Sequence, residues 1–385
     1  MNKLPIGFFL PLVCLSFVGY SQPIQGTLIG QDSTNRVITT AVPFLLITPD
    51  SRAAGMGDVG VATSADANSN YWNAAKLAFI EKGYGVSASY TPWLGKIIND
   101  MSIFYLSGFY KISREQTVAA SMKYFDLGAI QLRDGNNNSL GDFSPREFAF
   151  DVTYSRLLTD ELSLGGTLRY IHSNLTGAFN NGGIDAQPGN SVAVDLGIYH
   201  TKELQNTSIL SWGATITNIG AKITYSDANN RDFIPTNLRL GAAYEKPLGP
   251  QNSLTFAMDF NKLLVPSPRN GSKDESLLNG IFGSFSDASG GFSEELREVS
   301  ISTGVEYSYD DKFFGRLGYF HEASDKGNRK YLTAGVGAQF KQFGFDMAYL
   351  VPTNQRENAL AETIRFTIMM NFENKLKQNE TVTED

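Results

Sequence analysis

Hydrophobic and polar residues alternate along many segments of this chain, and each of these segments has about ten residues. In one of the clearest, Phe148, Phe150, Val152 and Tyr154 are separated by small or polar residues. Side chains that alternate with a period of two predict β-strands with one apolar and one polar face. We therefore expect an all-β protein.

The lengths of the segments and of their connectors separate a membrane barrel from a soluble sandwich, whose strands also bury one face. A strand that crosses a bilayer needs about 9 to 11 residues, whereas soluble strands usually have about 5 or 6. Segments of the longer kind are predicted to start near Gly83, Met101, Gln116, Phe148, Leu162, Ser191, Ser208, Asn237, Asn252, Val299, Phe313, Tyr331, Phe343 and Glu362. Their connectors alternate between short turns and long loops, as they do between the periplasmic and extracellular ends of outer-membrane barrels.

The predicted fold is therefore a transmembrane antiparallel β-barrel of about 14 strands over residues 83–372. An even number of strands returns the chain to the side where it began, so both termini are expected in the periplasm. Residues 373–385 would form a charged periplasmic tail. The predicted location is the outer membrane.

Residues 1–21 have the features of a cleavable secretory signal peptide: Lys3, an apolar stretch over 6–18, and small residues at Gly19 and Ser21. The only cysteine, Cys14, lies in this segment, so the mature protein would contain no thiol. Lipid attachment at Cys14 is the alternative, but the apolar stretch continues beyond it.

Residues 22–82 are predicted to form a periplasmic arm followed by a short helical plug. Residues 22–42 are polar and irregular, which favours a mobile arm in the periplasm. The following residues predict a glycine turn at 51–58, a short strand at 59–63, and a helix within 66–79 that Ser64 or Asp66 would cap.

The charge of the chain argues against nucleic-acid binding. The formal net charge is -7, and cleavage of the signal peptide removes Lys3 and no acidic residue, which makes the mature chain more negative still. A nucleic-acid-binding protein would instead carry a basic patch or stripe.

The polar faces of the predicted strands carry both acidic and basic residues. Mixed signs in a narrow lumen pair with one another and fill it, whereas a ring of one sign would favour an ion-selective pore. We therefore predict a plugged lumen; an ordinary salt-bridged barrel core without a role in transport remains the alternative. The predicted network consists of Asp151, Arg169, Asp195, Arg239, Asp259, Glu306, Arg316 and Arg365.

Catalytic and metal-binding patterns are sparse. The three histidines, His172, His200 and His321, are far apart in sequence and predict no metal cluster. His172 and Ser173 are neighbours on a predicted strand and therefore point to opposite faces, so they cannot pair as base and nucleophile without a bulge. We expect no enzymatic activity and no cofactor.

The connector over 262–298 is the longest and carries aliphatic and aromatic residues among glycines and serines. Long loops are usually functional or disordered, and apolar residues on a surface loop mark contact sites. Phe282, Phe285 and Phe292 are therefore candidate contacts for cargo or a partner protein. The alternative is that the loop folds over the barrel mouth as a lid.

Two groups of motifs carry a resemblance to a known family. Arg52-Ala53-Ala54-Gly55-Met56-Gly57 with Tyr71-Trp72-Asn73-Ala74-Ala75 resembles the N-terminal signature of FadL-like barrels, except that Ala74 stands where a proline is usual. Tyr90-Thr91-Pro92-Trp93-Leu94, Asn99-Asp100 and the strand over 105–111 resemble the PorV (LptO) family of the type IX secretion system in Bacteroidetes. The resemblance is densest over 40–111.

This resemblance implies a non-enzymatic secretion component of the outer membrane. Such proteins bind the C-terminal signal domain of secreted cargo, receive it from an SprA-like translocon, and deliver it to an attachment complex that contains a PorU-type sortase. The cargo site is expected on the extracellular loops. Trp93, at the first extracellular turn, is a candidate aromatic contact, and anchoring in the lipid headgroups is its alternative role.

Two other functions remain open from the sequence. A FadL-like transporter of hydrophobic solutes would need a continuous apolar path through the lumen. The acidic and basic residues on the polar faces of the strands argue against such a path. Deacylation of lipid A would need a nucleophile and base that the sequence does not bring together.

Overall fold

The computed structural model describes residues 37–93, 100–133, 137–175, 179–181, 184–226, 231–268, 275–353 and 363–373. All of them belong to one compact unit. The predicted signal peptide, the arm up to residue 36 and the tail from residue 374 lie outside the described residues.

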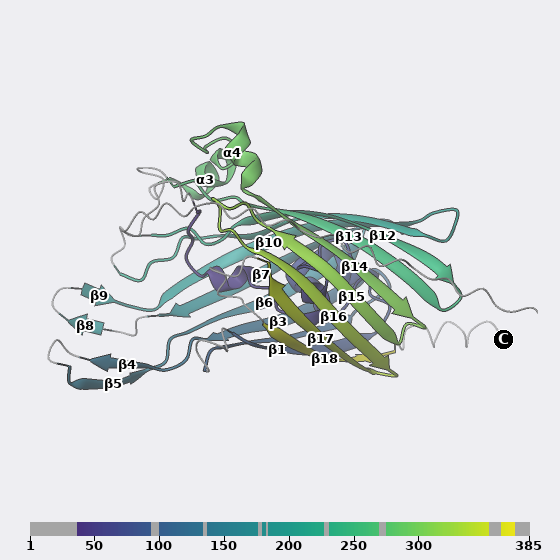
Figure 1. Cartoon of the computed structure of the whole chain (residues 1–385), viewed down its shortest axis with the longest axis horizontal. Coiled ribbons are helices and arrows are strands. Elements are labelled where there is room, and N and C mark those ends of the chain that lie inside the picture. Colours follow the sequence, from purple (N-terminus) through teal and green to yellow (C-terminus); the bar gives the residue numbers. More distant parts are fainter. Residues whose placement is uncertain are drawn as a thin grey trace, which may run out of the picture. The chain divides into compact units, whose positions relative to one another are not determined.

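A closed barrel of long antiparallel strands dominates the structure (Figure 1). Its strands are β1 (Tyr84–Pro92), β2 (Ser102–Lys111), β3 (Gln116–Asp126), β6 (Arg146–Leu157), β7 (Leu162–Asn174), β10 (Gly189–Glu203), β11 (Ile209–Gly220), β12 (Asn237–Gly249), β13 (Asn252–Leu263), β14 (Val299–Tyr309), β15 (Phe313–His321), β16 (Lys330–Phe340), β17 (Phe343–Pro352) and β18 (Ile364–Phe372). Each strand pairs with its neighbours in sequence, and β18 closes the ring onto β1, with Tyr84 opposite Phe372.

The predicted fold class is thus confirmed, and each barrel strand begins within about two residues of its predicted start. Short connectors lie at one end of the barrel, the turn end: residues 112–115, 158–161, 204–208, 250–251, 310–312 and 341–342. Long connectors lie at the other, the loop end. Two of them contain small hairpins, β4 (Ile130–Arg133) with β5 (Ser139–Phe143), and β8 (Phe179–Asn181) with β9 (Ile184–Ala186).

The two faces of each strand differ as the alternation predicts. On β6, Asp151, Thr153 and Ser155 are buried in the lumen, while Val152 and Tyr154 between them are exposed on the outside. The same pattern recurs around the ring. An apolar outer band around a polar interior is the arrangement of an outer-membrane barrel.

No helix among the described residues is long and apolar enough to span a membrane. The helices are short: η1 (Pro43–Leu46), α1 (Ser51–Gly55), α2 (Ser69–Trp72), η2 (Ala74–Phe79), α3 (Leu277–Gly283) and α4 (Phe292–Arg297).

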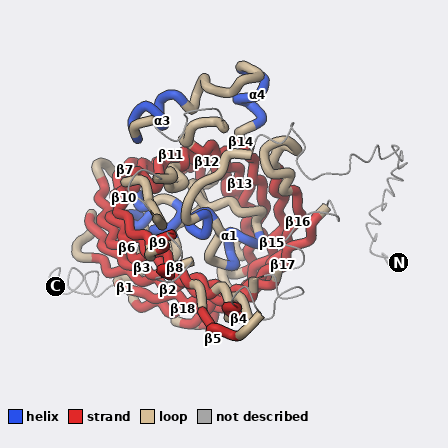
Figure 2. The backbone as a smooth tube through the Cα atoms, turned by 90° about the vertical axis from the view of Figure 1, so that its left-hand side faces the viewer, coloured by secondary structure: helices blue, strands red, loops and turns tan. Residues whose placement is uncertain are grey.

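Residues 37–83 run through the lumen from the loop end to the turn end, and we call this segment the plug. At the loop end, Ala41 N donates to Phe233 O at 2.9 Å. At the turn end, Gly83 N donates to Phe372 O at 2.9 Å. Between these points α1 packs against β15–β18 and η2 packs against β3, β6, β7 and β10, so both helices lie inside the ring of strands (Figure 2).

The local structure of the plug differs from the expectation in three places. Residues 51–55 form α1 instead of a glycine turn, because Asp50 Oδ2 accepts a hydrogen bond from Ala53 N at 3.0 Å and caps the helix. The expected single helix over 66–79 is interrupted at Asn73, whose backbone is extended and whose side chain accepts from Ala75 N at 3.1 Å. Residues 59–63 form no strand.

Residues 37–42, the described part of the predicted periplasmic arm, lie at the loop end and line the barrel mouth. Val42 is 1% exposed and packs in an apolar cluster with Phe44, Ile171 and Ile234. The sequence predicted this segment in the periplasm together with the start of β1, whereas the structure places it at the opposite end of the barrel from Gly83. A polar segment was expected in solvent, but its Ala41 and Val42 are apolar and bury against the loop that precedes β12.

Candidate functional site

An ion-pair network joins the plug to the wall formed by β14–β17. Glu306 accepts from Arg52 of the plug at 2.8 and 3.0 Å and from Arg316 Nε at 2.6 Å. Arg316 also pairs with Asp346, and Arg52 with Asp66 at 3.2 Å. Glu306 and Arg316 are each at most 5% exposed. In such a dry site, ionised groups need this degree of pairing because their desolvation is costly.

A second network lies on the opposite wall. Arg169 of β7 pairs with Asp151 of β6 at 2.7 Å and with Asp195 of β10 at 3.0 Å, and its Nη1 donates to Asn218 of β11. Asn218 in turn donates its backbone N–H to Asp195 at 2.6 Å. The network therefore ties four consecutive strands of this wall together.

Buried charged side chains hold the middle of the plug by hydrogen bonds to its backbone. Asp259 of β13 accepts from Gly60 N at 2.7 Å and from Val61 N at 3.0 Å. Lys76 donates to Gly60 O at 2.7 Å and is 1% exposed. Gly60 has no room for a side chain, because an added Cβ would lie 2.1 Å from the Trp72 ring.

All eight residues of the predicted lumen network are buried in the barrel interior. They do not form one cluster: Arg169 and Arg316 centre two separate networks, and Arg365 contacts Asp58 at 3.5 Å. Arg52, the plug residue that pairs with Glu306, was not among the predicted lumen charges, although a charged residue directly before the small residues of 53–55 was a signal that could have revealed it.

Arg239 differs from the other buried arginines. It lies over the rings of Tyr71 and Trp72, 5.1 Å from each centroid, and its Nε donates to the Asn237 side-chain oxygen at 2.9 Å once that amide is correctly oriented. Its Nη1 has no hydrogen-bond partner, and it forms no salt bridge with any described residue.

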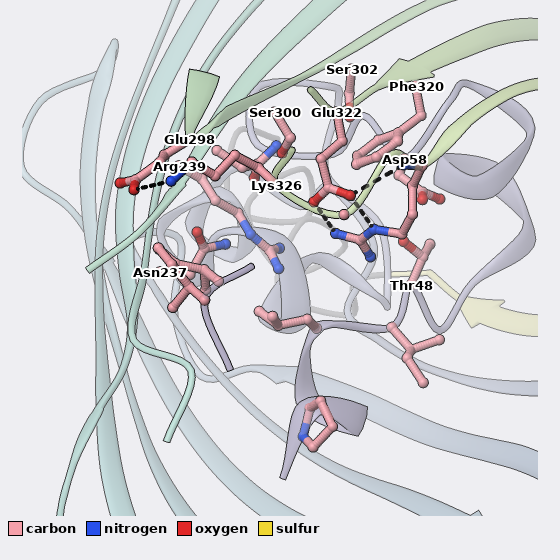
Figure 3. A pocket seen from close by; sticks show the side chains of 18 of the residues that line it. Thr48, Asp58, Asn237, Arg239, Glu298, Ser300, Ser302, Phe320, Glu322 and Lys326 are labelled. Atoms are coloured by element: carbon pink, nitrogen blue, oxygen red, sulfur yellow. Dashed lines mark hydrogen bonds and ion pairs between the residues drawn. The ribbon is translucent and has the colours of Figure 1, made fainter. Parts of the chain in front are cut away.

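Arg239 reaches into a cavity of about 490 Å³ at the loop end (Figure 3). Residues 37–48 of the plug form one side of this cavity, and β12–β16 with their connectors form the other. Its lining mixes apolar groups such as Ile38 and Phe320 with hydroxyls such as Ser302. The Glu322–Arg329 pair, at 2.8 Å, stands at the rim.

The connector between β13 and β14 carries α3 and α4, and a buried polar cluster fixes it to the barrel. Lys262 pairs with Glu295 at 2.9 Å and with Glu298 at 2.7 Å, and Lys326 pairs with Glu298 at 2.9 Å. Burial by itself would raise the pKa of Glu298, but the hydrogen bonds from Lys262 and Lys326 outweigh it and hold that pKa below its usual 4.5.

The outer surfaces of α3 and α4 form two unpartnered apolar stripes. Leu278 and Phe282 are four residues apart on one face of α3, Phe285 lies in the turn that follows α3, and Phe292 and Leu296 follow one face of α4. Phe282 is 72% exposed and Phe292 is 77% exposed. We call these five residues the apolar patch. Figures 1 and 2 place α3 and α4 beside the rim near β11–β14 and outside the ring of strands.

Trp93, the fourth predicted contact residue, lies elsewhere. It is half-buried at the end of β1, packs edge-on against Phe125 with ring centroids 6.1 Å apart, and joins the apolar cluster that contains Val42 and Phe44. It is remote from the apolar patch in the fold, and the other three predicted contact residues lie on the one connector between β13 and β14.

No group of side chains suited to a metal ion occurs among the described residues. His172 Nδ1 lies 2.8 Å from Asn190 Oδ1 on the exposed side of β7, while Ser173 Oγ points inward and donates to Glu147 at 2.6 Å. The two side chains thus face opposite sides of the barrel wall, as expected for neighbours on a strand.

The closed barrel with an N-terminal segment through its lumen defines the class of the protein as a plugged outer-membrane β-barrel. The chain belongs to the PorV family: the family model described as "Type IX secretion system protein PorV" matches residues 30–270. Its role is therefore in the outer membrane and associated with type IX secretion, and the PorV and FadL-like families are secretion and transport proteins.

Solved structures share the fold at low sequence identity. A mutant of the monoaromatic hydrocarbon channel TodX has a TM-score of 0.53 at 12% identity, with 84% of this chain and 98% of that chain covered. The monoaromatic hydrocarbon channel CymD has a TM-score of 0.50 at 13% identity, with the same coverage. A FadL homologue from Pseudomonas aeruginosa has a TM-score of 0.47 at 10% identity, with 88% and 100% covered. No curated protein sequence matches the chain.

Proposed function

We propose that this protein is the cargo-binding shuttle of a type IX secretion system. It binds the C-terminal signal domain of cargo that emerges from an SprA-like translocon and delivers the cargo to an attachment complex with a PorU-type sortase. The apolar patch at the loop end is the observation that carries this proposal, together with membership of the PorV family.

The patch has the properties of a built contact surface. Its side chains stand out in solvent, while the polar cluster beneath them, centred on Lys262 and Lys326, holds the backbone in place. Exposed aromatic residues on a fixed support are typical of protein-binding sites, because little conformational entropy is lost when a partner covers them. A position outside the ring of strands leaves the patch open to a partner and favours contact over a lid.

The filled lumen favours a function as a shuttle over a function as a pore. The plug occupies the barrel from end to end, and its Arg52 is tied to the wall by the network around Glu306, while Asp259 of the wall holds the backbone of Gly60 and Val61. A continuous path for solutes would require these buried pairs to break, which is costly for charges out of water.

The orientation of the barrel follows from its connectors. Long loops of outer-membrane barrels face outside and short turns face the periplasm. The apolar patch would therefore face the cell exterior, and the end of β18, where Lys82 pairs with Glu373 at 2.7 Å, would face the periplasm.

A transporter of hydrophobic solutes is the second candidate. The cavity of about 490 Å³ at the loop end favours it, since this volume lies in the range of small-molecule sites. The cavity ends on the plug, so transport would additionally require the plug to move.

The deciding experiment is an affinity purification of the tagged full chain from native outer membranes in mild detergent, followed by mass spectrometry. A shuttle predicts co-purification of a very large barrel protein and of several proteins that share a C-terminal domain. Recovery of the barrel without proteins, but with a bound fatty acid, would overturn the shuttle in favour of the transporter. Uptake of labelled fatty acid by deletion cells is the matching control, and the shuttle predicts unchanged uptake with a lost secreted proteome.

A further inference from the structure

We propose that a groove on the outer wall of the barrel binds one acyl chain of a phospholipid whose phosphate lies at Arg156, near the turn end. The groove has a volume of about 610 Å³ and crosses β1, β2, β3 and β6. It lies on the lipid-facing side of the barrel, so the inference does not depend on the shuttle proposal or on the apolar patch.

The groove exists because one row of outward positions carries almost no side chains. Gly108 of β2 and Ala120 of β3 are paired across the two strands and form its floor. Larger outward side chains stand on both sides of this floor: Leu106 and Met122 towards the loop end, and Tyr110 and Val118 towards the turn end. The outer wall is thus hollowed along a single row.

The interior of the barrel does not account for the glycine at position 108. At the inward-facing Gly165 and Gly318, an added Cβ would lie 2.4 Å and 2.1 Å from the backbone of the plug. Gly108 faces outward, between the buried neighbours Ser107 and Phe109. An added Cβ there would lie 3.3 Å from its nearest neighbour, the backbone oxygen of the adjacent strand, and would not meet the plug. The space above Gly108 is therefore open on the lipid side only.

Aromatic side chains on both sides place the groove at the level of the hydrocarbon. Towards the loop end, Tyr90 and Phe104 are paired on neighbouring strands, with ring centroids 4.9 Å apart. Towards the turn end, Tyr84 is paired with Tyr110. Girdles of aromatic residues mark the two interfaces of an outer-membrane barrel, and the band between them faces hydrocarbon. We therefore expect acyl chains, and not water, to cover the groove.

The width of the groove favours a single chain over a second protein. Leu106 and Tyr110 are four residues apart, so their Cα atoms are separated by about 13 Å, and their own side chains take up part of this span. A helix with its side chains is about 10–12 Å wide, and a second sheet would cover a broad face at a distance of about 10 Å. An unbranched acyl chain is thinner than either, and the flexible Met122 can adapt to it.

The polar end of the lipid has an anchor at the turn end. Arg156 is an outward position of β6, four residues beyond Val152 at the edge of the groove and thus about 13 Å from it. Arg156 is 54% exposed, and its partner Glu115 is 57% exposed and 3.6 Å away. Such an exposed pair is weak, so the guanidinium can exchange it for a phosphate, which it binds through two parallel hydrogen bonds. Because short turns face the periplasm, the lipid would belong to the periplasmic leaflet.

The test is native mass spectrometry of the purified full chain, stripped of lipid in a non-ionic detergent. The chain is titrated with dioleoyl phosphatidylglycerol or with dioleoylglycerol, which lacks the phosphate. Ala120→Leu fills the floor of the groove, and Arg156→Gln removes the phosphate contact. Ala334→Leu is the matched control, because Ala334 is exposed on the outer face of β16, outside the groove. Folding of each variant is checked by the heat-dependent mobility of the barrel on a gel.

We expect the wild-type chain to bind one phosphatidylglycerol more tightly than any further lipid. Ala120→Leu should weaken this first binding about ten-fold, the effect of about two methylene groups displaced from the groove, and Ala334→Leu should leave it unchanged. Dioleoylglycerol should bind roughly ten-fold more weakly than phosphatidylglycerol, and Arg156→Gln should remove most of this difference.

Three results would overturn the proposal: equal first binding in folded Ala120→Leu and Ala334→Leu, equal binding of the two lipids to the wild-type chain, or a folded Arg156→Gln that keeps the difference between them. If Ala120→Leu binds the lipid normally but loses a membrane protein on purification from native outer membranes, the groove is a protein contact instead.

A second measurement decides the matter if Ala120→Leu does not fold. The mature chain is expected to contain no cysteine, so Val152→Cys and Val336→Cys would each carry a single bimane label. Both valines are exposed on the outer face, but only Val152 borders the groove. One equivalent of phosphatidylglycerol with brominated chains should quench the label at position 152 more strongly than the label at position 336. Equal quenching at the two positions would overturn the proposal.

Discussion

Arg52 of the plug and Glu306 of the barrel wall are joined by two parallel hydrogen bonds, from Nε to Oε2 at 3.0 Å and from Nη2 to Oε1 at 2.8 Å. The same carboxylate accepts from Arg316 on the neighbouring strand. One buried acid thus bridges two arginines that come from the plug and from the wall, and each arginine has one further partner, Asp66 for Arg52 and Asp346 for Arg316. Without Glu306 the two guanidinium groups would lose the counter-charge that they share in a dry site, so we expect the closed state of the lumen to depend on this carboxylate.

Glu306→Gln should therefore loosen the plug and destabilise the barrel. Removing one member of a buried ion pair costs about 3–5 kcal/mol, because the remaining charge stays uncompensated. Urea unfolding of the barrel in detergent measures the change, and entry of a large antibiotic into cells reports on the lumen. Glu115→Gln is the control, since Glu115 and its partner Arg156 are 57% and 54% exposed at the turn end and such surface pairs contribute about 0–1 kcal/mol. Equal effects of the two substitutions would contradict this role of Glu306.

Gly318 of β15 gives a steric test of how the plug docks. An added Cβ at this position would lie 2.1 Å from Gly57 N and from Met56 C of the plug. Gly318→Ala should therefore displace the plug, raise permeability and lower the midpoint of unfolding. Gly315→Ala, on the same strand, has open space around its Cβ and should behave as the wild-type chain. Permeability that rises in neither variant would show that the plug does not need this close approach.

The docking of α3 and α4 should depend on pH through Glu298 and Lys326. The pKa of Glu298 lies below 4.5, so its ion pairs stabilise docking above that pH and are lost as the pH falls through the lowered value. Burial by itself would lower the pKa of Lys326, but the hydrogen bonds that it donates to Glu294 and Glu298 outweigh burial and raise that pKa above 10.5, so its contribution is lost only at pH values above 10.5. Docking should thus be constant between these limits and weaken in acid.

Fluorescence anisotropy of a dye on Ser289→Cys, an exposed position between the two helices, measures this docking. The anisotropy should stay constant between pH 4.5 and 10.5 and fall as the pH drops below 4.5. Lys326→Gln should move the onset of this fall to a higher pH, because Glu298 then loses one of its donors. A signal that does not change in acid would rule out these ion pairs as the anchor.

The barrel could be predicted from the sequence because its strands obey a local rule. Whether a strand residue is apolar or polar depends on whether its own side chain faces lipid or the lumen. The alternation with a period of two is therefore visible in the local sequence. The path of the plug could not be predicted in the same way. Residues 37–42 lie at the loop end because Ala41 binds Phe233, almost 200 residues away in sequence. Such long-range contacts leave no local pattern.

The candidate site was predictable in part for the same reason. Phe282 and Phe292 stand out in the sequence because aromatic residues in a long loop are unusual. Arg239 looked in the sequence like the other lumen charges, since its lack of a carboxylate partner depends on where the neighbouring strands place their acids. Trp93 resembled an exposed anchor, but its burial depends on Phe125 and on the plug, which the sequence does not place beside it.

The apolar patch leads to the last prediction: the double substitution Phe282→Ser and Phe292→Ser should abolish recovery of partner proteins while leaving the barrel stable. Both side chains are more than 70% exposed, so their loss should change the free energy of unfolding by only about 0.5 kcal/mol. In an interface, each aromatic contact can contribute about 2 kcal/mol or more. Affinity purification with quantitative mass spectrometry compares the variants. Phe340→Ser is the matched control, because Phe340 is 70% exposed but ends β16 at the turn end, where no cargo is expected. Partner recovery that survives the double substitution would place the contact elsewhere on the loops, whereas equal loss in both variants would indicate a general effect of exposed apolar residues on the barrel.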